Sequence, residues 1–73
     1  MDIFAEGQLA GAFEGWSGDT VFELTNGQKW QQARYAYRYV YRYRPRVKIL
    51  KDGARYYLAV DDIDDIIEVR RLV

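Results

Sequence analysis

The sequence contains no cysteine and no histidine among its 73 residues. Without cysteine the fold cannot be held by disulfides, and without either residue it lacks the ligands of structural zinc sites. The same absences remove the thiolate nucleophile and the commonest general base. We therefore predict a protein that is not an enzyme, with no metal site and no cofactor. The lack of cysteine also fits a reducing compartment, so we expect a cytoplasmic location.

Long apolar runs are also missing, and none approaches the roughly 20 residues that a membrane span needs. Residues 1–13 carry Asp2 and Glu6 in place of the basic residues that open a secretory signal. We therefore expect a soluble protein with no membrane segment. A chain of 73 residues is long enough for one small domain and too short for two, so residues 1–73 are predicted to share one core.

The net charge is zero, since 11 basic residues balance 11 acidic ones, but the charges are unevenly distributed along the chain. Residues 1–28 contain five acids and no base, whereas residues 29–55 contain nine bases and one acid. Residues 56–73 contain five acids and two bases. This distribution favours ion pairs between a basic middle strand and acidic neighbours across a sheet.

The most informative pattern that is present is a run of five tyrosines at every second position. The run comprises Tyr35, Tyr37, Tyr39, Tyr41 and Tyr43, alternating with Ala36, Arg38, Val40 and Arg42. A period of two is the pattern of a β-strand, which gathers alternate side chains on one face, whereas a helix would scatter them. The run therefore predicts a strand with an aromatic face and a basic face.

Turn signals divide the rest of the chain into short strands. Asn26-Gly27 and Asp52-Gly53 are strong hairpin signals, and Pro45 interrupts pairing at its own position. No segment has helical periodicity. The predicted strands cover residues 7–14, 19–25, 28–43, 46–51, 54–60 and 66–72.

The predicted strand over residues 28–43 is too long to be straight. It would span roughly 50 Å at ~3.3 Å per residue, whereas a chain of this length folds to a radius of gyration of about 11 Å. The strand must therefore bend. Short strands, tight turns and one long bent strand predict an all-β fold, an SH3-like partly open barrel or roll of five to six antiparallel strands. An OB-type barrel is the alternative.

The register of the first hairpin decides which way the tyrosines point. A two-residue turn at Asn26-Gly27 places Phe22 opposite Gln31 and turns the tyrosine run toward the face of Phe22 and Leu24. A three-residue turn with a bulge reverses this inference and brings Trp30 inward.

In the second hairpin, a two-residue turn at Asp52-Gly53 places Ile49 opposite Tyr56 and Val47 opposite Leu58. One apolar face then contains Val47, Ile49, Tyr56, Leu58 and Val60. If the chain runs extended through Pro45, this face is continuous with the tyrosine run, because both occupy odd-numbered positions.

The only clustered carboxylates are Asp61, Asp62, Asp64 and Asp65. An EF-hand loop needs a central glycine and a distal glutamate at fixed spacing, and this stretch has neither. We interpret it as a solvated turn that is anchored by the apolar residue Ile63.

Several motifs together resemble a known family. They are Asn26-Gly27 with the following Trp30 and Gln32, the tyrosine run, Pro45 with Val47 and Ile49, and a closing Val69-x-Arg71-Leu72. Over residues 10–72, the chain resembles a family of small uncharacterised bacterial proteins. This resemblance implies a compact all-β domain from a bacterium or a mobile element, with no assigned activity.

We predict that the protein is an interaction module. An aromatic strand face can bind a protein or peptide partner, or a second copy in a homodimer. The predicted contact residues are Trp16, Trp30, Tyr37, Tyr39 and Tyr41. Alternatively, the tyrosines have a structural role and pack over an apolar face of the fold. Both can hold, with one end of the run buried and the other end in contact with a partner.

The alternative function is nucleic-acid binding, in which basic side chains follow the phosphate backbone and tyrosines stack on bases. The candidate residues are Arg38, Arg42, Arg44, Arg46 and Lys48. Arginines and tyrosines point to opposite faces of the predicted strand, so both can contact one nucleic acid only at an edge or a bend. A zero net charge also disfavours a non-specific polyanion binder.

Overall fold

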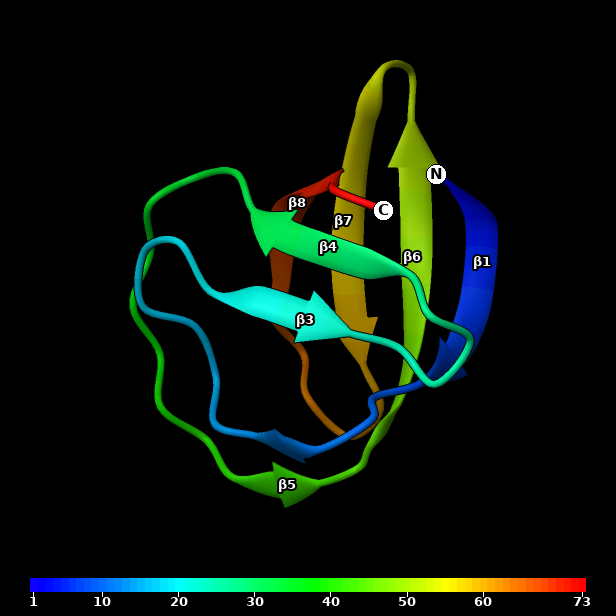
Figure 1. The fold of residues 1–73 in the computed structure, drawn as a ribbon. Coiled ribbons are helices and arrows are strands. Elements are labelled where there is room, and N and C mark those ends of the chain that lie inside the picture. Colours follow the sequence, from blue (N-terminus) through cyan, green and yellow to red (C-terminus); the bar gives the residue numbers. More distant parts are fainter.

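The fold consists of β-strands only, in a computed structural model that describes residues 1–73. In chain order the strands are β1 (Asp2–Gln8), β2 (Ala12–Phe13), β3 (Val21–Glu23), β4 (Lys29–Gln32), β5 (Arg42–Tyr43), β6 (Arg46–Asp52), β7 (Arg55–Val60) and β8 (Ile66–Arg71). Six of them form one antiparallel sheet in the order β1-β6-β7-β8-β4-β3, and β2 pairs with β5 in a second sheet (Figure 1). The predicted all-β class is confirmed.

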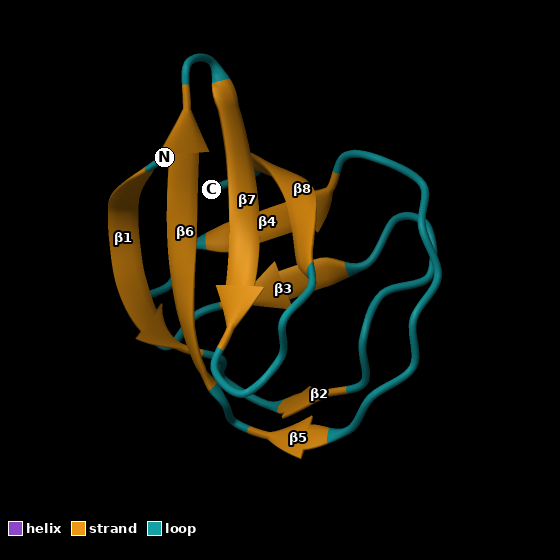
Figure 2. Cartoon of the chain, turned by 180° about the vertical axis from the view of Figure 1, so that it is seen from behind, coloured by secondary structure: helices purple, strands orange, loops and turns teal.

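The six-stranded sheet curls until its two edges approach each other without closing. Leu9, just after β1, forms an isolated bridge with Leu24, just after β3. Two backbone hydrogen bonds of 2.9 Å hold this contact, from Ala10 N–H to the Glu23 carbonyl and from Thr25 N–H to the Gln8 carbonyl. The pairing goes no further, so the fold is a partly open roll. The small β2–β5 sheet lies across its lower end (Figure 2).

The core fills the inside of this roll. Thirteen buried apolar residues form one cluster, namely Leu9, Phe13, Trp16, Phe22, Leu24, Trp30, Val47, Ile49, Leu58, Val60, Ile63, Ile67 and Val69. Most come from alternate strand positions, as expected for strands with one buried face. Four large aromatic side chains share the space with aliphatic ones, which helps a short chain to bury enough apolar surface.

The second hairpin buries the predicted apolar face in a different register. Its turn is Gly53-Ala54, one residue later than predicted, and Gly53 has the positive φ of 61° that suits the first central residue of a type II′ turn. Ile49 therefore pairs with Leu58 and Val47 with Val60. The predicted partners are wrong by two residues. Because the side-chain period is also two, every side chain keeps its predicted face.

The first hairpin adopts the three-residue turn of the alternative prediction. Leu24 N–H donates to the Gln28 carbonyl, Gly27 N–H donates to the Leu24 carbonyl, and Gly27 has a φ of 92°. Phe22 consequently pairs with Trp30, and both side chains lie in the core. The two-residue register, which placed Phe22 opposite Gln31, is wrong.

The predicted strand over residues 28–43 is divided. Only its two ends form strands, β4 and β5, and the intervening chain makes one isolated bridge, between Trp16 and Arg38. We call residues 33–43 the tyrosine strap. Within it Ala36 and Val40 pack against the core, so the odd-numbered tyrosines point outward. The prediction that they face Phe22 and Leu24 is wrong, because the bulged turn at Gly27 exchanges the two faces.

The faces are exchanged a second time at the end of the strap. Arg44 has a φ of 47°, which breaks the extended alternation just before Pro45. Tyr43 is exposed and Val47 is buried, although both have odd numbers. The expected continuity between the tyrosine run and the apolar face of β6 is therefore wrong.

One glycine controls the attachment of the strap. A Cβ at Gly15 would lie 1.9 Å from the Arg38 carbonyl oxygen, and Gly15 has a φ of 90°. We expect Gly15→Ala to lower the free energy of unfolding by about 2–4 kcal/mol, since backbone must move on both sides of the bridge. Gly11→Ala is the matched control because no atom lies within 4 Å of its added Cβ. Equal midpoints of urea unfolding for the two variants would contradict this account.

Candidate interaction surface

All five tyrosines of the strap are exposed. Their relative accessibilities are 79% for Tyr35, 72% for Tyr37, 64% for Tyr39, 49% for Tyr41 and 72% for Tyr43. In both ribbon views the strap forms the outer rim of the molecule between β4 and β5 (Figures 1 and 2). The residues of the predicted aromatic face thus lie together on one side of an extended segment. Three of the five predicted contact residues, Tyr37, Tyr39 and Tyr41, belong to this exposed row.

A buried glutamine fixes the beginning of the strap. Gln32 is 4% exposed, and its Nε2 donates to the Arg34 carbonyl at 2.9 Å and to the Ala36 carbonyl at 3.0 Å. Its Oε1 has no hydrogen-bond partner within the protein. A buried polar side chain that satisfies two backbone carbonyls stabilises one local conformation. The sequence gives one signal for this role, since a glutamine two residues after an inward Trp30 occupies a core position.

The middle of the strap is held at Arg38. Its N–H donates to the Trp16 carbonyl and its carbonyl accepts from Trp16 N–H, both at 2.9 Å. The Arg38 guanidinium also forms a hydrogen-bonded ion pair with Asp65, in the loop between β7 and β8. Backbone and side chain together connect the strap to two other segments, which limits its movement relative to the core.

The other candidate basic residues lie around the second half of the strap. Arg42 is half-buried and donates to the Tyr41 carbonyl at 2.8 Å. Arg44 and Arg46 are exposed, and Lys48 is half-buried. Arg38–Asp65 is the single ion pair of the structure. The register does place opposite charges across the ladder, at Asp2↔Lys51, Glu6↔Lys48 and Glu23↔Lys29, but none of these pairs comes within ion-pair distance. The expected network of ion pairs is therefore not formed.

The two tryptophans belong to the core. Trp16 is 4% exposed and Trp30 is 0% exposed. Trp30 packs against Tyr56 at a centroid distance of 5.3 Å, and Trp16 packs edge-on against Phe13 at 6.2 Å. Their assignment as contact residues is wrong, because both indole rings are buried in the core cluster. For Trp30 the cause is the three-residue turn before it, which directs its side chain inward.

The acidic loop is organised as predicted. Ile63 is buried, whereas Asp61, Asp62, Asp64 and Asp65 are exposed. No group of three or more acidic, histidine or cysteine side chains is arranged to hold a metal ion. One of these carboxylates, that of Asp65, forms the ion pair with Arg38 of the strap.

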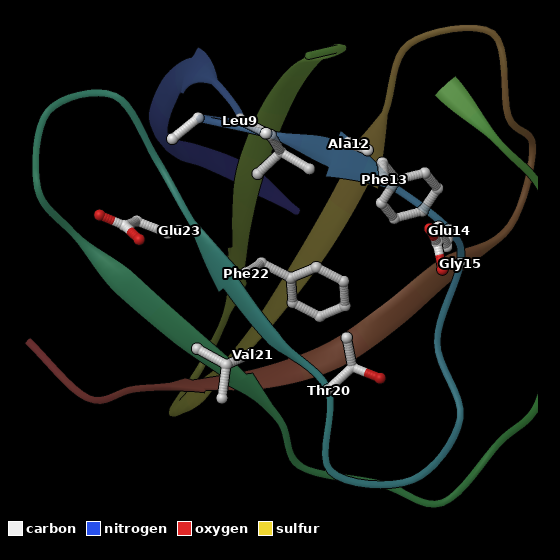
Figure 3. Close-up of a pocket in the computed structure, with 11 residues that line it drawn as sticks. Leu9, Ala12, Phe13, Glu14, Gly15, Thr20, Val21, Phe22 and Glu23 are labelled. Carbon is white, nitrogen blue, oxygen red and sulfur yellow. The ribbon is translucent and has the colours of Figure 1, made fainter. Parts of the chain in front are cut away.

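Two hollows lie near these segments. The first, of about 220 Å³, lies beside the strap and is lined by residues 14–17 and 37–39. The second is a groove of about 330 Å³ between β2 and β3, lined by residues 9–15 and 20–23 (Figure 3). Neither was predicted, because each depends on where the pairing between distant segments stops.

Comparison with known proteins gives no relative, since no protein family, curated protein or solved structure matches the chain. The resemblance to a family of small bacterial proteins stays a prediction. The structure contains no helix of the length and apolarity that a membrane span requires.

The role of Gln32 can be tested by limited proteolysis. Gln32→Met keeps the length of the side chain and removes both bonds to strap carbonyls, so we expect a loss of about 1–3 kcal/mol in stability. We also expect faster tryptic cleavage after Arg34 and Arg38. Gln31→Met is the control, since the Gln31 side chain lies on the other face of β4. Equal cleavage rates in the two variants would show that Gln32 does not hold the strap.

Proposed function

We propose that this protein is an interaction module and that the tyrosine strap is its contact surface. The observation that carries the proposal is the exposure of all five tyrosines on one side of an extended, anchored segment. Tyrosine combines a large apolar ring with a hydroxyl and has only two side-chain torsions to fix, which suits it to protein interfaces. We also propose a cytoplasmic location, because the chain has no cysteine.

The size of the surface supports this proposal. A buried aromatic side chain contributes about 150–250 Å², so five tyrosines exposed by half to four-fifths offer roughly 500–800 Å². A standard protein interface buries about 800 Å² on each partner. The strap alone therefore supplies most of the area that one side of a specific interface needs.

The attachment of the strap also supports a binding role. Ala36 and Val40 pack on the core, and Arg38 is bonded on both its backbone and its side chain. A surface that is already ordered loses less conformational entropy on association. The hollow beside Tyr37 and Tyr39 offers a place for one inserted side chain of the partner.

A second candidate function is favoured by one observation. Arg44 and Arg46 are exposed and make no ion pair, and they lie at the end of the tyrosine run. Unpaired arginines beside exposed aromatic rings are the elements of single-strand nucleic-acid binding. Arg38, in contrast, is occupied by Asp65, which reduces the basic surface available to phosphate groups.

The two functions differ in a light-scattering experiment. We expect the protein-contact function to show as a mass that rises with protein concentration, because a second copy is the simplest partner for an aromatic surface. The same series is repeated with single-stranded DNA at low and moderate salt. Nucleic-acid binding would instead give a complex whose affinity falls steeply as salt rises. A monomer at every concentration that ignores the DNA contradicts both functions.

Matched variants separate the tyrosines from the arginines. We expect Tyr37→Ser with Tyr39→Ser to reduce self-association at least tenfold, with an unchanged unfolding midpoint because both rings are exposed. Arg44→Glu with Arg46→Glu should leave self-association within about threefold of the original value. The opposite ranking, with DNA binding lost in the arginine variant alone, would support the nucleic-acid function.

A further inference from the structure

At the groove between β2 and β3, the antiparallel pairing of residues 8–10 with residues 23–25 ends. Ala10 N–H donates to the Glu23 carbonyl, but the reciprocal bond from Glu23 N–H to the Ala10 carbonyl is not formed. The chain bends at Ala10 and Gly11, and β2 then leaves β3 to pair with β5. The two strands diverge from this point, and the groove opens between them (Figure 3).

Backbone groups on the β3 wall have no partner. Thr20, Phe22 and Leu24 direct their N–H and carbonyl groups toward β4, as the bonds from Gln32 N–H to the Thr20 carbonyl and from Leu24 N–H to the Gln28 carbonyl show. In an antiparallel strand the alternate residues direct theirs to the other side. The N–H and carbonyl of Val21, and the N–H of Glu23, therefore face the groove unpaired.

The opposite wall carries a matching pair of groups. Arg44 N–H donates to the Gly11 carbonyl, so Gly11 and Phe13 direct their backbone groups toward β5. Ala12 lies between them and directs its N–H and carbonyl away from β5, toward the groove. Donors and acceptors thus face the groove from both walls.

The two walls of the groove do not pair with each other. No Cα of β2 lies within 8 Å of a Cα of β3. Directly paired strands lie about 4.8 Å apart, so a strand inserted between two others needs a separation of about 9.6 Å. The walls are too far apart to pair with each other, and their spacing is compatible with a strand between them.

Side chains define the chemistry of such a strand. On the inner side the groove is floored by Leu9, Phe13 and Phe22, with 6.1 Å between the two phenyl centroids (Figure 3). On the outer side it is flanked by Ala12 and Val21 and, beyond them, by Glu14 and Glu23, which are exposed and make no ion pair. No basic residue lines the groove. An inserted strand would therefore meet apolar groups on one face and carboxylates on the other.

We propose that this groove binds an extended peptide segment of a partner protein, in which apolar and basic residues alternate. The segment pairs with the free backbone groups of Ala12, Val21 and Glu23. Its apolar side chains face Phe13 and Phe22, and its lysine or arginine side chains lie beside Glu14 and Glu23. Strand addition of this kind draws affinity from main-chain hydrogen bonds and specificity from alternate side chains. The site is separate from the tyrosine strap.

Two peptides of about eight residues test the proposal, one alternating Val with Lys and the other alternating Val with Glu. We expect fluorescence anisotropy to show that the lysine peptide binds at least tenfold more tightly. Amide shifts in the NMR spectrum should concentrate at Ala12, Val21 and Glu23. The absence of binding by the lysine peptide, or equal binding of both peptides, would overturn the proposal.

Variants test the backbone and the charges separately. Val21→Pro removes one groove-facing N–H and leaves the β3–β4 bonds in place, so we expect at least a tenfold loss of affinity. Val21→Thr keeps the N–H and should bind as the original protein does. Glu14→Lys with Glu23→Lys should reverse the preference toward the glutamate peptide, even if the proline variant does not fold.

The tyrosine variants provide the last control. Tyr37→Ser with Tyr39→Ser should leave the affinity for the lysine peptide unchanged, because these residues do not line the groove. A loss of peptide binding in this variant would move the site to the strap and overturn the proposal. The tyrosine variant therefore distinguishes a failure of the self-association proposal from a failure of the peptide-binding proposal.

Discussion

The three-residue turn between Leu24 and Gln28 sets the phase of the chain that follows it. Its extra residue turns Trp30 into the core opposite Phe22, and Gln32 is buried in the same phase. Along the strap Ala36 and Val40 pack inward and the five tyrosines are exposed, whereas Arg34, at a bend, is exposed as well. A strand has only two faces, so a single inserted residue is sufficient to exchange a buried aromatic row for an exposed one. The proposed contact surface depends on this local feature.

The sequence predicts much of the C-terminal half and less of the strap. Hydrophobic alternation locates β6, β7 and β8 within one or two residues, and it assigns Val47, Ile49, Leu58 and Val60 to one face. Hydrophobic alternation does not determine how many residues a turn contains, so Asn26-Gly27 is compatible with both orientations of the tyrosines. The left-handed conformation of Arg44 has no residue signal at all, because glycine or asparagine usually occupies such positions. Burial of Trp30 follows from the extra residue in the turn before it.

Both proposed sites lie where pairing between strands is incomplete. The strap keeps one bridge, at Arg38, and otherwise presents side chains, whereas the groove presents backbone groups. The two surfaces recognise different properties, an aromatic row in one case and an unfinished ladder in the other. The tyrosine strap and the groove have no residue in common, but Glu14 and Gly15 line both the groove and the hollow beside the strap. The acidic loop links the first surface to the core, since Asp65 holds Arg38.

The place of β8 in the sheet has a consequence for the order of folding. This last strand lies between β7 and β4, and it is the only strand that joins the β3–β4 hairpin to the rest of the six-stranded ladder. Without β8 the six-stranded sheet is divided into the β1-β6-β7 segment and the β3–β4 hairpin, and an isolated hairpin is marginally stable in water. Completion of this sheet therefore requires Ile66–Arg71. Folding is then expected to be cooperative, on the millisecond-to-second scale typical of non-local strand pairing.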